Sequence, residues 1–156
     1  MNRLVLLQVI VGSRGFRFSG KCDSQTQTDC PSLSRVALYV WWAFDLPDVA
    51  VFKWERIPRD PDGRVANAFQ LAPDWTVEIL SPDQSQTKVI RNILHCLENG
   101  AEMGWLIDPE ERSVFVYFAD RPVAICEHPS AQIPVPESAE GFELTVGELF
   151  GWLAGC

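Results

Sequence analysis

The stretch Pro47-Asp48-Val49-Ala50-Val51-Phe52 and the later stretch Pro73-Asp74-Trp75-Thr76-Val77-Glu78-Ile79-Leu80 decide the fold. Both are short and rich in β-branched and aromatic residues, and each opens with a proline, which a strand tolerates at its first position. Residues 58–63, which lie between them, contain the Pro, Asp and Gly of tight turns, so the chain is expected to reverse there. We therefore predict that strands 48–54 and 74–80 form an antiparallel hairpin at the centre of the protein.

The rest of the chain supplies helices and a second hairpin around this centre. Ser81 or Asp83 can cap a helix that runs to about Asn99, with Gly100 as its stop. Strands are predicted at 105–107 and 113–118, joined by a turn at 108–112, and a short helix is predicted at 144–153 with Thr145 as its cap. This order of elements predicts the α+β class.

The N-terminal part is harder to interpret. Residues 4–18 carry two β-branched apolar runs around glycines, which favours a hairpin, and residues 19–31 are polar and predict a loop. The dense apolar and aromatic run at 36–44 favours a buried strand. A chain of 156 residues suits one domain, so we predict a single domain over 1–156, with a core at 45–120 and an irregular or truncated part at 1–40.

The charge of the chain is acidic and unevenly distributed. The net charge is −8, and residues 1–72 hold nine Lys/Arg against seven Asp/Glu whereas residues 73–156 hold four against fourteen. A protein that binds nucleic acid without sequence preference usually has a basic face, because phosphate neutralisation supplies most of its affinity. The charge therefore argues against general nucleic-acid binding, but it leaves open a metal-dependent nuclease, whose acidic cluster first binds cations.

The cysteines and the apolar runs of the sequence indicate the cellular compartment of the protein. The five cysteines form no CxxC pair, and the two histidines match no zinc template. The apolar runs are shorter than the roughly 18–20 residues that span a bilayer. We therefore predict a cytoplasmic protein with free thiols and no membrane partner.

Glu78 is an acidic residue in the middle of an otherwise apolar strand. One explanation is an edge strand with a wet outer face, and the other is a metal ligand, because a desolvated carboxylate is costly unless it is paired or coordinated. Asp74 lies four residues away on the same strand, about 13 Å at roughly 3.3 Å per residue, too far to share an ion, and is better explained as a turn or capping carboxylate. In an antiparallel hairpin, Asp48 instead falls beside Glu78.

The two stretches quoted above, together with Ser81-Pro82, Lys88, Trp105-Leu106-Ile107-Asp108-Pro109 and Val114-Phe115-Val116-Tyr117, resemble the PD-(D/E)XK nuclease superfamily. Within it, the chain is most similar to the Uma-type putative restriction endonuclease family. The resemblance covers roughly residues 45–120. It implies a restriction-endonuclease-like fold, in which a central mixed β-sheet carries a β-hairpin active-site core and is flanked by helices.

The resemblance also implies a chemistry. Asp48 and Glu78 would bind Mg²⁺ or Mn²⁺, and a lysine would help to position the water that attacks a phosphodiester of DNA. The usual position of that lysine holds Leu80, so Lys88 on the following helix is the predicted catalytic substitute, with Arg91 as a competitor. The alternative is a catalytically impaired interaction or dimerisation module of the same fold, and the expected partners are DNA and, as an open option, a second copy of the chain.

The resemblance leads to a geometric test. The carboxylates of Asp48 and Glu78 should lie within about 4–6 Å of each other if they share one ion. Lys88 should point toward them, and the pKa values of the two acids should then be lowered by its charge.

Overall fold

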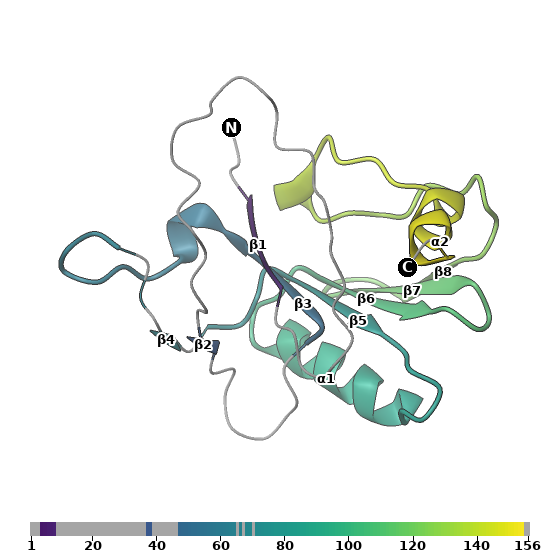
Figure 1. Cartoon of the computed structure of the whole chain (residues 1–156), viewed down its shortest axis with the longest axis horizontal. Coiled ribbons are helices and arrows are strands. Elements are labelled where there is room, and N and C mark those ends of the chain that lie inside the picture. The colour runs from purple at the N-terminus through teal and green to yellow at the C-terminus, as the bar shows by residue number, and fades with distance from the viewer. Residues whose placement is uncertain are drawn as a thin grey trace.

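The computed structural model describes residues 4–8, 37–38, 47–64, 66, 68–69 and 71–154, and for 4–8, 37–38 and 68–69 only the course of the backbone (Figure 1). None of the helices in these segments is long and apolar enough to cross a membrane. The elements, in chain order, are β1 (Leu4–Gln8), β2 (Ala37–Leu38), β3 (Val49–Lys53), η1 (Trp54–Arg56), β4 (Ala68–Phe69), β5 (Trp75–Ile79), α1 (Gln86–Glu98), β6 (Met103–Asp108), β7 (Ser113–Phe118), β8 (Ala124–Cys126), η2 (Glu137–Ala139) and α2 (Val146–Ala154).

A six-stranded mixed sheet organises these elements, and this confirms the predicted α+β class. Its strand order is β1-β3-β5-β6-β7-β8, and every neighbouring pair is antiparallel except β5 and β6, which are parallel. Helix α1 makes the crossover that a parallel pair requires. A separate two-stranded pair, β2 with β4, is parallel.

The predicted central pair of strands is confirmed. Strand β3 runs antiparallel to β5, with Val49 opposite Val77, Ala50 opposite Thr76 and Val51 opposite Trp75. Continuing this register by one residue places Asp48 opposite Glu78, at the end of the pair where β5 leaves the sheet. Because side chains alternate across a strand, Asp48, Ala50, Thr76 and Glu78 share one face of the sheet.

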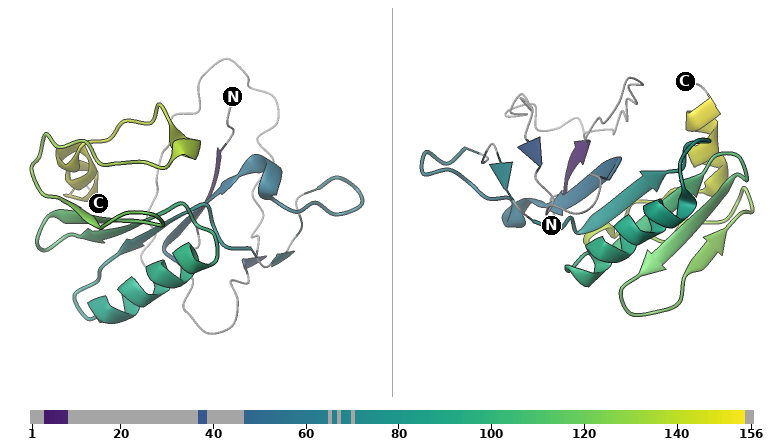
Figure 2. Two further views of the ribbon diagram at one scale, coloured as in Figure 1. Left: turned by 180° about the vertical axis from the view of Figure 1, so that it is seen from behind. Right: turned by 90° about the horizontal axis from the view of Figure 1, so that it is seen from below.

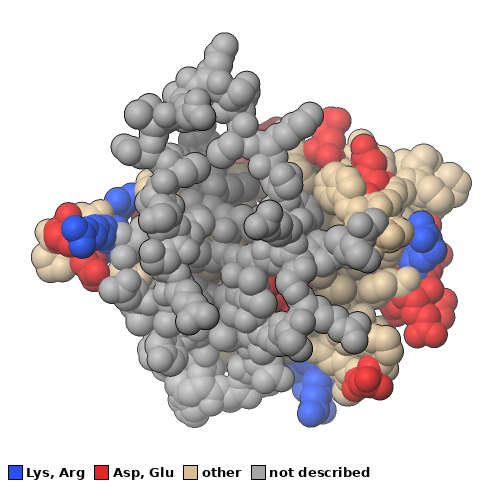
Figure 3. Space-filling model, viewed as in Figure 1, with Lys and Arg blue, Asp and Glu red and all other residues tan. Residues whose placement is uncertain are grey.

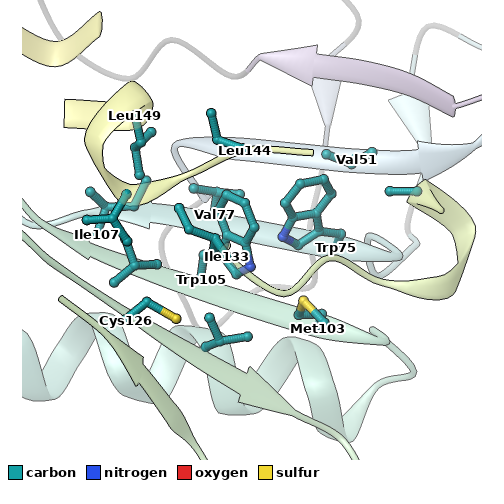
Figure 4. Packing of buried hydrophobic residues seen from close by; sticks show 14 of the residues in the cluster. Val51, Trp75, Val77, Met103, Trp105, Ile107, Cys126, Ile133, Leu144 and Leu149 are labelled. Atoms are coloured by element: carbon teal, nitrogen blue, oxygen red, sulfur yellow. The ribbon is translucent and has the colours of Figure 1, made fainter. Parts of the chain in front are cut away.

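The two faces of the sheet pack against different helices (Figure 2). The face that carries Trp75 and Trp105 is covered by α2 and the segment before it, and the two indole rings meet edge to face with centroids 4.6 Å apart (Figure 4). The opposite face packs against α1, where Ile93 and Leu106 are completely buried. Asp48 and Glu78 belong to the α1 face, so this helix is the element that can complete a site around them.

Gly104 lets α1 approach the sheet closely. A Cβ atom at this position of β6 would overlap the Cγ2 methyl of Ile93 and lie 3.1 Å from the Cγ2 methyl of Thr76. Only a residue without a side chain therefore fits between α1 and β5 at this point. The distance between the helix and the two acids depends on that contact.

Two expectations about element boundaries were wrong. Helix α1 begins at Gln86 with Ser85 as its N-cap, because residues 81–84 form a separate turn closed by a 2.9 Å hydrogen bond from Gln84 N to Ser81 O. Strand β8 lies between the strand predicted at 113–118 and the helix predicted at 144–153, where no further strand was expected.

Other expectations held, and some lie outside the described residues. Strand β7 is confirmed at 113–118, and α2 is confirmed with a capping box in which Thr145 N donates to Glu148 Oε2 and Glu148 N donates to Thr145 Oγ1. Strand β1 pairs with β3, but residues 9–18 of the expected hairpin are not described. Of the expected strand at 36–44, the structure describes residues 37–38, which form β2.

Candidate active site

The structure brings Asp48 and Glu78 together on the α1 face. The backbone N–H of Asp48 donates to Glu78 Oε2 over 3.4 Å, and the backbone N–H of Ile79 donates to Asp48 Oδ2 over 2.8 Å. The carboxylate of Glu78 thus accepts from the backbone of Asp48, and the carboxylate of Asp48 accepts from the backbone of Ile79, the residue after Glu78. The antiparallel register predicted this proximity. Glu78 is buried with 4% of its surface exposed, which excludes a wet outer face as the reason for an acid in this strand.

The expectation of lowered pKa values was wrong for Asp48. Its pKa is raised above the ordinary 3.8, because burial disfavours the charged form more than the hydrogen bond from Ile79 favours it. The contribution of Asp48 to stability is therefore present below pH 3.8 and is lost as the pH rises through the raised pKa of the folded state. At neutral pH this carboxylate makes the fold less stable unless a ligand interacts with its charge.

Asn92 on α1 belongs to this site, and reasoning from the sequence missed it. Only 6% of its surface is exposed. Its Nδ2 donates a short hydrogen bond to Glu78 Oε1. It lies among Val89, Ile93 and Cys96, the other buried residues of the helix. The signal in the sequence was an amide at a position of helical spacing where each neighbour on the same face is apolar.

Lys88, the predicted catalytic lysine, lies on the exposed side of α1. Lys88 is exposed in the first turn of α1, and the structure gives it no ion pair with a carboxylate of the described residues. The helix starts five residues later than Ser81, so the first turn lies beyond the end of the sheet and Asn92, one turn further on, is the residue that faces Glu78. Arg91 is exposed as well. Leu80, at the position two residues after Glu78, packs against the apolar cluster of α1.

Cys96 is a buried residue of α1 whose thiol is close enough to Glu78 to interact with its charge. Its thiol is 1% exposed and lies beside the hydroxyl of Thr76, whose Oγ1 is fully buried without a nitrogen or oxygen partner among the described residues. Burial raises the pKa of the Cys96 thiol to about 11, against a smaller opposing effect of the Thr76 hydroxyl, and the charge of Glu78 raises it further. The thiolate is therefore scarce at neutral pH.

We expect Cys96 to resist alkylation in the folded protein, because the thiolate is the reactive form and both burial and the raised pKa suppress it. Iodoacetamide at pH 8, followed by peptide mass spectrometry, should leave Cys96 unmodified until a denaturant is added. Rapid labelling of Cys96 in the native protein would show that α1 opens away from the sheet. Cys126, which is also buried with a raised thiol pKa, provides the comparison on the opposite face.

A second group of charges lies at the other end of β5. Asp74, with 2% of its surface exposed, accepts hydrogen bonds from the backbone N–H of Lys53 over 2.8 Å and from Arg56 Nη1 over 2.5 Å. The ammonium of Lys53 makes a short ion pair with Glu102, which also accepts from Ser138 Oγ over 3.1 Å. Asp74 is therefore the buried centre of a partly exposed ion-pair cluster, rather than the turn or capping residue that was expected.

The residues at the Asp48 end fit a hard divalent cation with few protein ligands. No group of three or more His, Cys, Asp or Glu able to hold a metal exists among the described residues, so two carboxylates are what this part of the chain offers. Mg²⁺ keeps several waters and is commonly bound through one or two carboxylates, which suits this pair. The 3.4 Å hydrogen bond to Glu78 Oε2 is long for an N–H donor, so this oxygen is held weakly by Asp48 N.

The strand order and the crossover helix define an α+β domain, and a similar solved structure shows that its fold is nuclease-like. The chain belongs to the Uma2 family, described as putative restriction endonucleases, whose family pattern matches residues 34–147. It is similar to a solved structure described as a putative nuclease belonging to DUF820 from Anabaena variabilis ATCC 29413, with 55% identity and a TM-score of 0.68. The match covers 70% of this chain and 61% of that one. No curated protein matches the chain.

Proposed function

We propose that the protein is a metal-dependent endonuclease that hydrolyses phosphodiester bonds of DNA at the Asp48–Glu78 pair. The observation that carries this proposal is the contact of the two acids on one face of the sheet, where Asp48 N reaches Glu78 Oε2 over 3.4 Å. Membership of a family described as restriction endonucleases supports the same reaction class. Mg²⁺ or Mn²⁺ is the proposed cofactor, because both carboxylates are hard oxygen ligands.

The residues of the site would have distinct tasks. Asp48 and Glu78 would hold the cation, which supplies polarisation of the phosphodiester and stabilisation of the leaving oxygen. Ile79 N keeps Asp48 directed toward Glu78, and Asn92 orients Glu78 from the helix. Lys88 stays the proposed group for positioning the attacking water, and it would have to reach the site from the exposed first turn of α1.

The surface charge bears on how DNA would be held. On the face drawn in Figure 3, acidic side chains are spread over the side of the molecule that carries α2 and β8, with few basic ones between them. Phosphate neutralisation by a broad basic surface is therefore not supported on that side. A cation bound by Asp48 and Glu78 would attract the phosphate of DNA at this one place. DNA binding should therefore depend on the metal.

The first test is metal binding. Millimolar Mn²⁺ or Mg²⁺ should raise the melting temperature, since a ligand that binds only the native state stabilises it by about 2.7 kcal/mol at a hundredfold excess over its Kd. The variants Asp48→Asn and Glu78→Gln keep the shape of the acids and should lose this shift. Equal melting temperatures of the wild type with and without metal would refute the metal dependence.

The second test is cleavage, with supercoiled plasmid DNA as the substrate and Mn²⁺ in the buffer. The wild type should nick the plasmid, whereas Glu78→Gln, purified in the same way, should not. Lys88→Ala should keep the metal-induced melting shift and lose cleavage if Lys88 acts on the water. The same residual nicking in wild type and Glu78→Gln would indicate contamination and refute the proposal.

A second candidate function is a non-catalytic interaction module of the same fold. Two observations favour it: Leu80 packs against α1 where the superfamily has its lysine, and Lys88 is exposed. This candidate predicts no cleavage under any of the conditions above, with or without a metal-induced shift of the melting temperature. The cleavage test therefore separates the two functions.

A further inference from the structure

Asn92 is a buried amide in the apolar contact between α1 and the sheet. Burying an amide without a hydrogen-bond partner costs free energy, so a polar residue is retained at such a position only when it has a partner. Its Nδ2 donates to Glu78 Oε1, which satisfies the amide and restricts the rotation of the Glu78 side chain. A leucine would fill nearly the same volume and pack well, so packing alone does not explain an asparagine here.

Three neutral donors make hydrogen bonds to the acid pair. The bonds are Asn92 Nδ2 to Glu78 Oε1, Asp48 N to Glu78 Oε2, and Ile79 N to Asp48 Oδ2. A lysine or arginine at position 92 would orient Glu78 as well, but it would also add a positive charge beside it. Asn92 orients Glu78 without adding that charge.

Asn92 and Asp48 contact different oxygens of Glu78. Asn92 Nδ2 donates to Oε1, whereas Asp48 N donates to Oε2 over 3.4 Å, which is long for an N–H donor and therefore weak. The oxygen that Asn92 binds is turned toward the helix, and the weakly held oxygen is turned toward Asp48. This geometry presents Oε2 on the side where an ion shared with Asp48 would lie.

We propose that Asn92 is a positioning residue that sets the affinity of the Asp48–Glu78 pair for a divalent cation, by orienting Glu78 without adding a positive charge of its own. The inference rests on the proposed metal dependence and extends it to a residue of the helix. Groups that orient metal ligands usually change metal affinity by about 10–100-fold when they are removed.

The experiment compares Mn²⁺ affinity, measured by isothermal titration calorimetry, in the wild type and two variants. Asn92→Leu removes the donor at similar volume and should weaken Mn²⁺ binding by about 10–100-fold. Asn92→Lys keeps a donor but adds a cation, and it should also weaken binding, with a higher melting temperature in the absence of metal than Asn92→Leu. Leu94→Lys adds the same charge at an exposed position of α1 and should bind Mn²⁺ like the wild type.

The outcomes separate this inference from the proposed function. If Asp48→Asn loses Mn²⁺ binding while Asn92→Leu and Asn92→Lys bind like the wild type, the metal site stands and the role of Asn92 is refuted. If Leu94→Lys weakens binding as much as Asn92→Lys, the effect is general charge and the inference also fails. Absence of Mn²⁺ binding by the wild type refutes both. Circular dichroism checks folding, and Asn92→Ala replaces Asn92→Leu if the leucine variant does not fold.

Discussion

Asp74→Ala is expected to lower the free energy of unfolding by about 1–3 kcal/mol, the range for leaving a hydrogen-bonding partner of a buried group unsatisfied. The carboxylate is 3% exposed and binds both the Arg56 guanidinium and the backbone N–H of Lys53, so its loss leaves a cation and a backbone donor without their acceptor. Thermal unfolding should show a lower melting temperature, by about 2–4 °C for each kcal/mol in a domain of this size.

Asp62→Ala provides the matched control for this prediction. Asp62 also pairs with an arginine, Arg64, but the two side chains are 54% and 85% exposed. Exposed pairs contribute about 0–1 kcal/mol, so this variant should unfold almost as the wild type does. If Asp74→Ala and Asp62→Ala lose the same stability, the buried cluster contributes no more than a surface pair and the prediction fails.

Gly104→Ala is expected to destabilise the protein by about 1–3 kcal/mol, as overpacking of a core does. The added methyl group would overlap Ile93 Cγ2, which sits on a stiff β-branched side chain and cannot rotate away freely. Helix α1 would have to move off the sheet. Because Asn92 is next to Ile93, the same change should weaken metal-induced stabilisation. Urea unfolding with and without Mn²⁺ measures both effects.

Gly151→Ala is the control for the glycine substitution. Gly151 lies in α2, on the opposite face of the sheet, and a Cβ atom there would meet nothing within 4 Å. Alanine is a better helix former than glycine by about 1 kcal/mol, so this variant should be slightly more stable than the wild type. Loss of stability in Gly151→Ala but not in Gly104→Ala would contradict the packing described for α1.

The central part of the fold could be predicted because its signals are local. Proline at the start of two short apolar strands, with turn residues between them, was enough to predict that β3 and β5 pair and that Asp48 meets Glu78. The start of α1 was predicted too early, because Ser81-Pro82-Asp83 suits an isolated turn as well as a helix cap. Strand β8 was missed because three residues show too little alternation to recognise.

The parts of the site that were missed depend on contacts between distant residues. Asn92 meets Glu78 fourteen positions away, and only the packing of α1 on β6 through Gly104 decides which residue of the helix does so. The burial that raises the pKa of Asp48 arises in the same way. The expectation that Asp74 is a turn or capping residue was wrong because Arg56 reaches it from η1, an element that the sequence did not predict.

The hydrogen bonds of Asp74 also help to fix the register of β3 against β5. Asp74 lies four residues before Glu78, about 13 Å along β5 at roughly 3.3 Å per residue. A slip of one residue between β3 and β5 would turn Asp48 toward the face of Trp75 and Val77 and separate it from Glu78. Lys53 N and Arg56, bound to Asp74, hold the far end of the pair in its register. The connection between β3 and β5 can therefore gain or lose residues beyond Arg56, at a small entropic cost, without moving the acids.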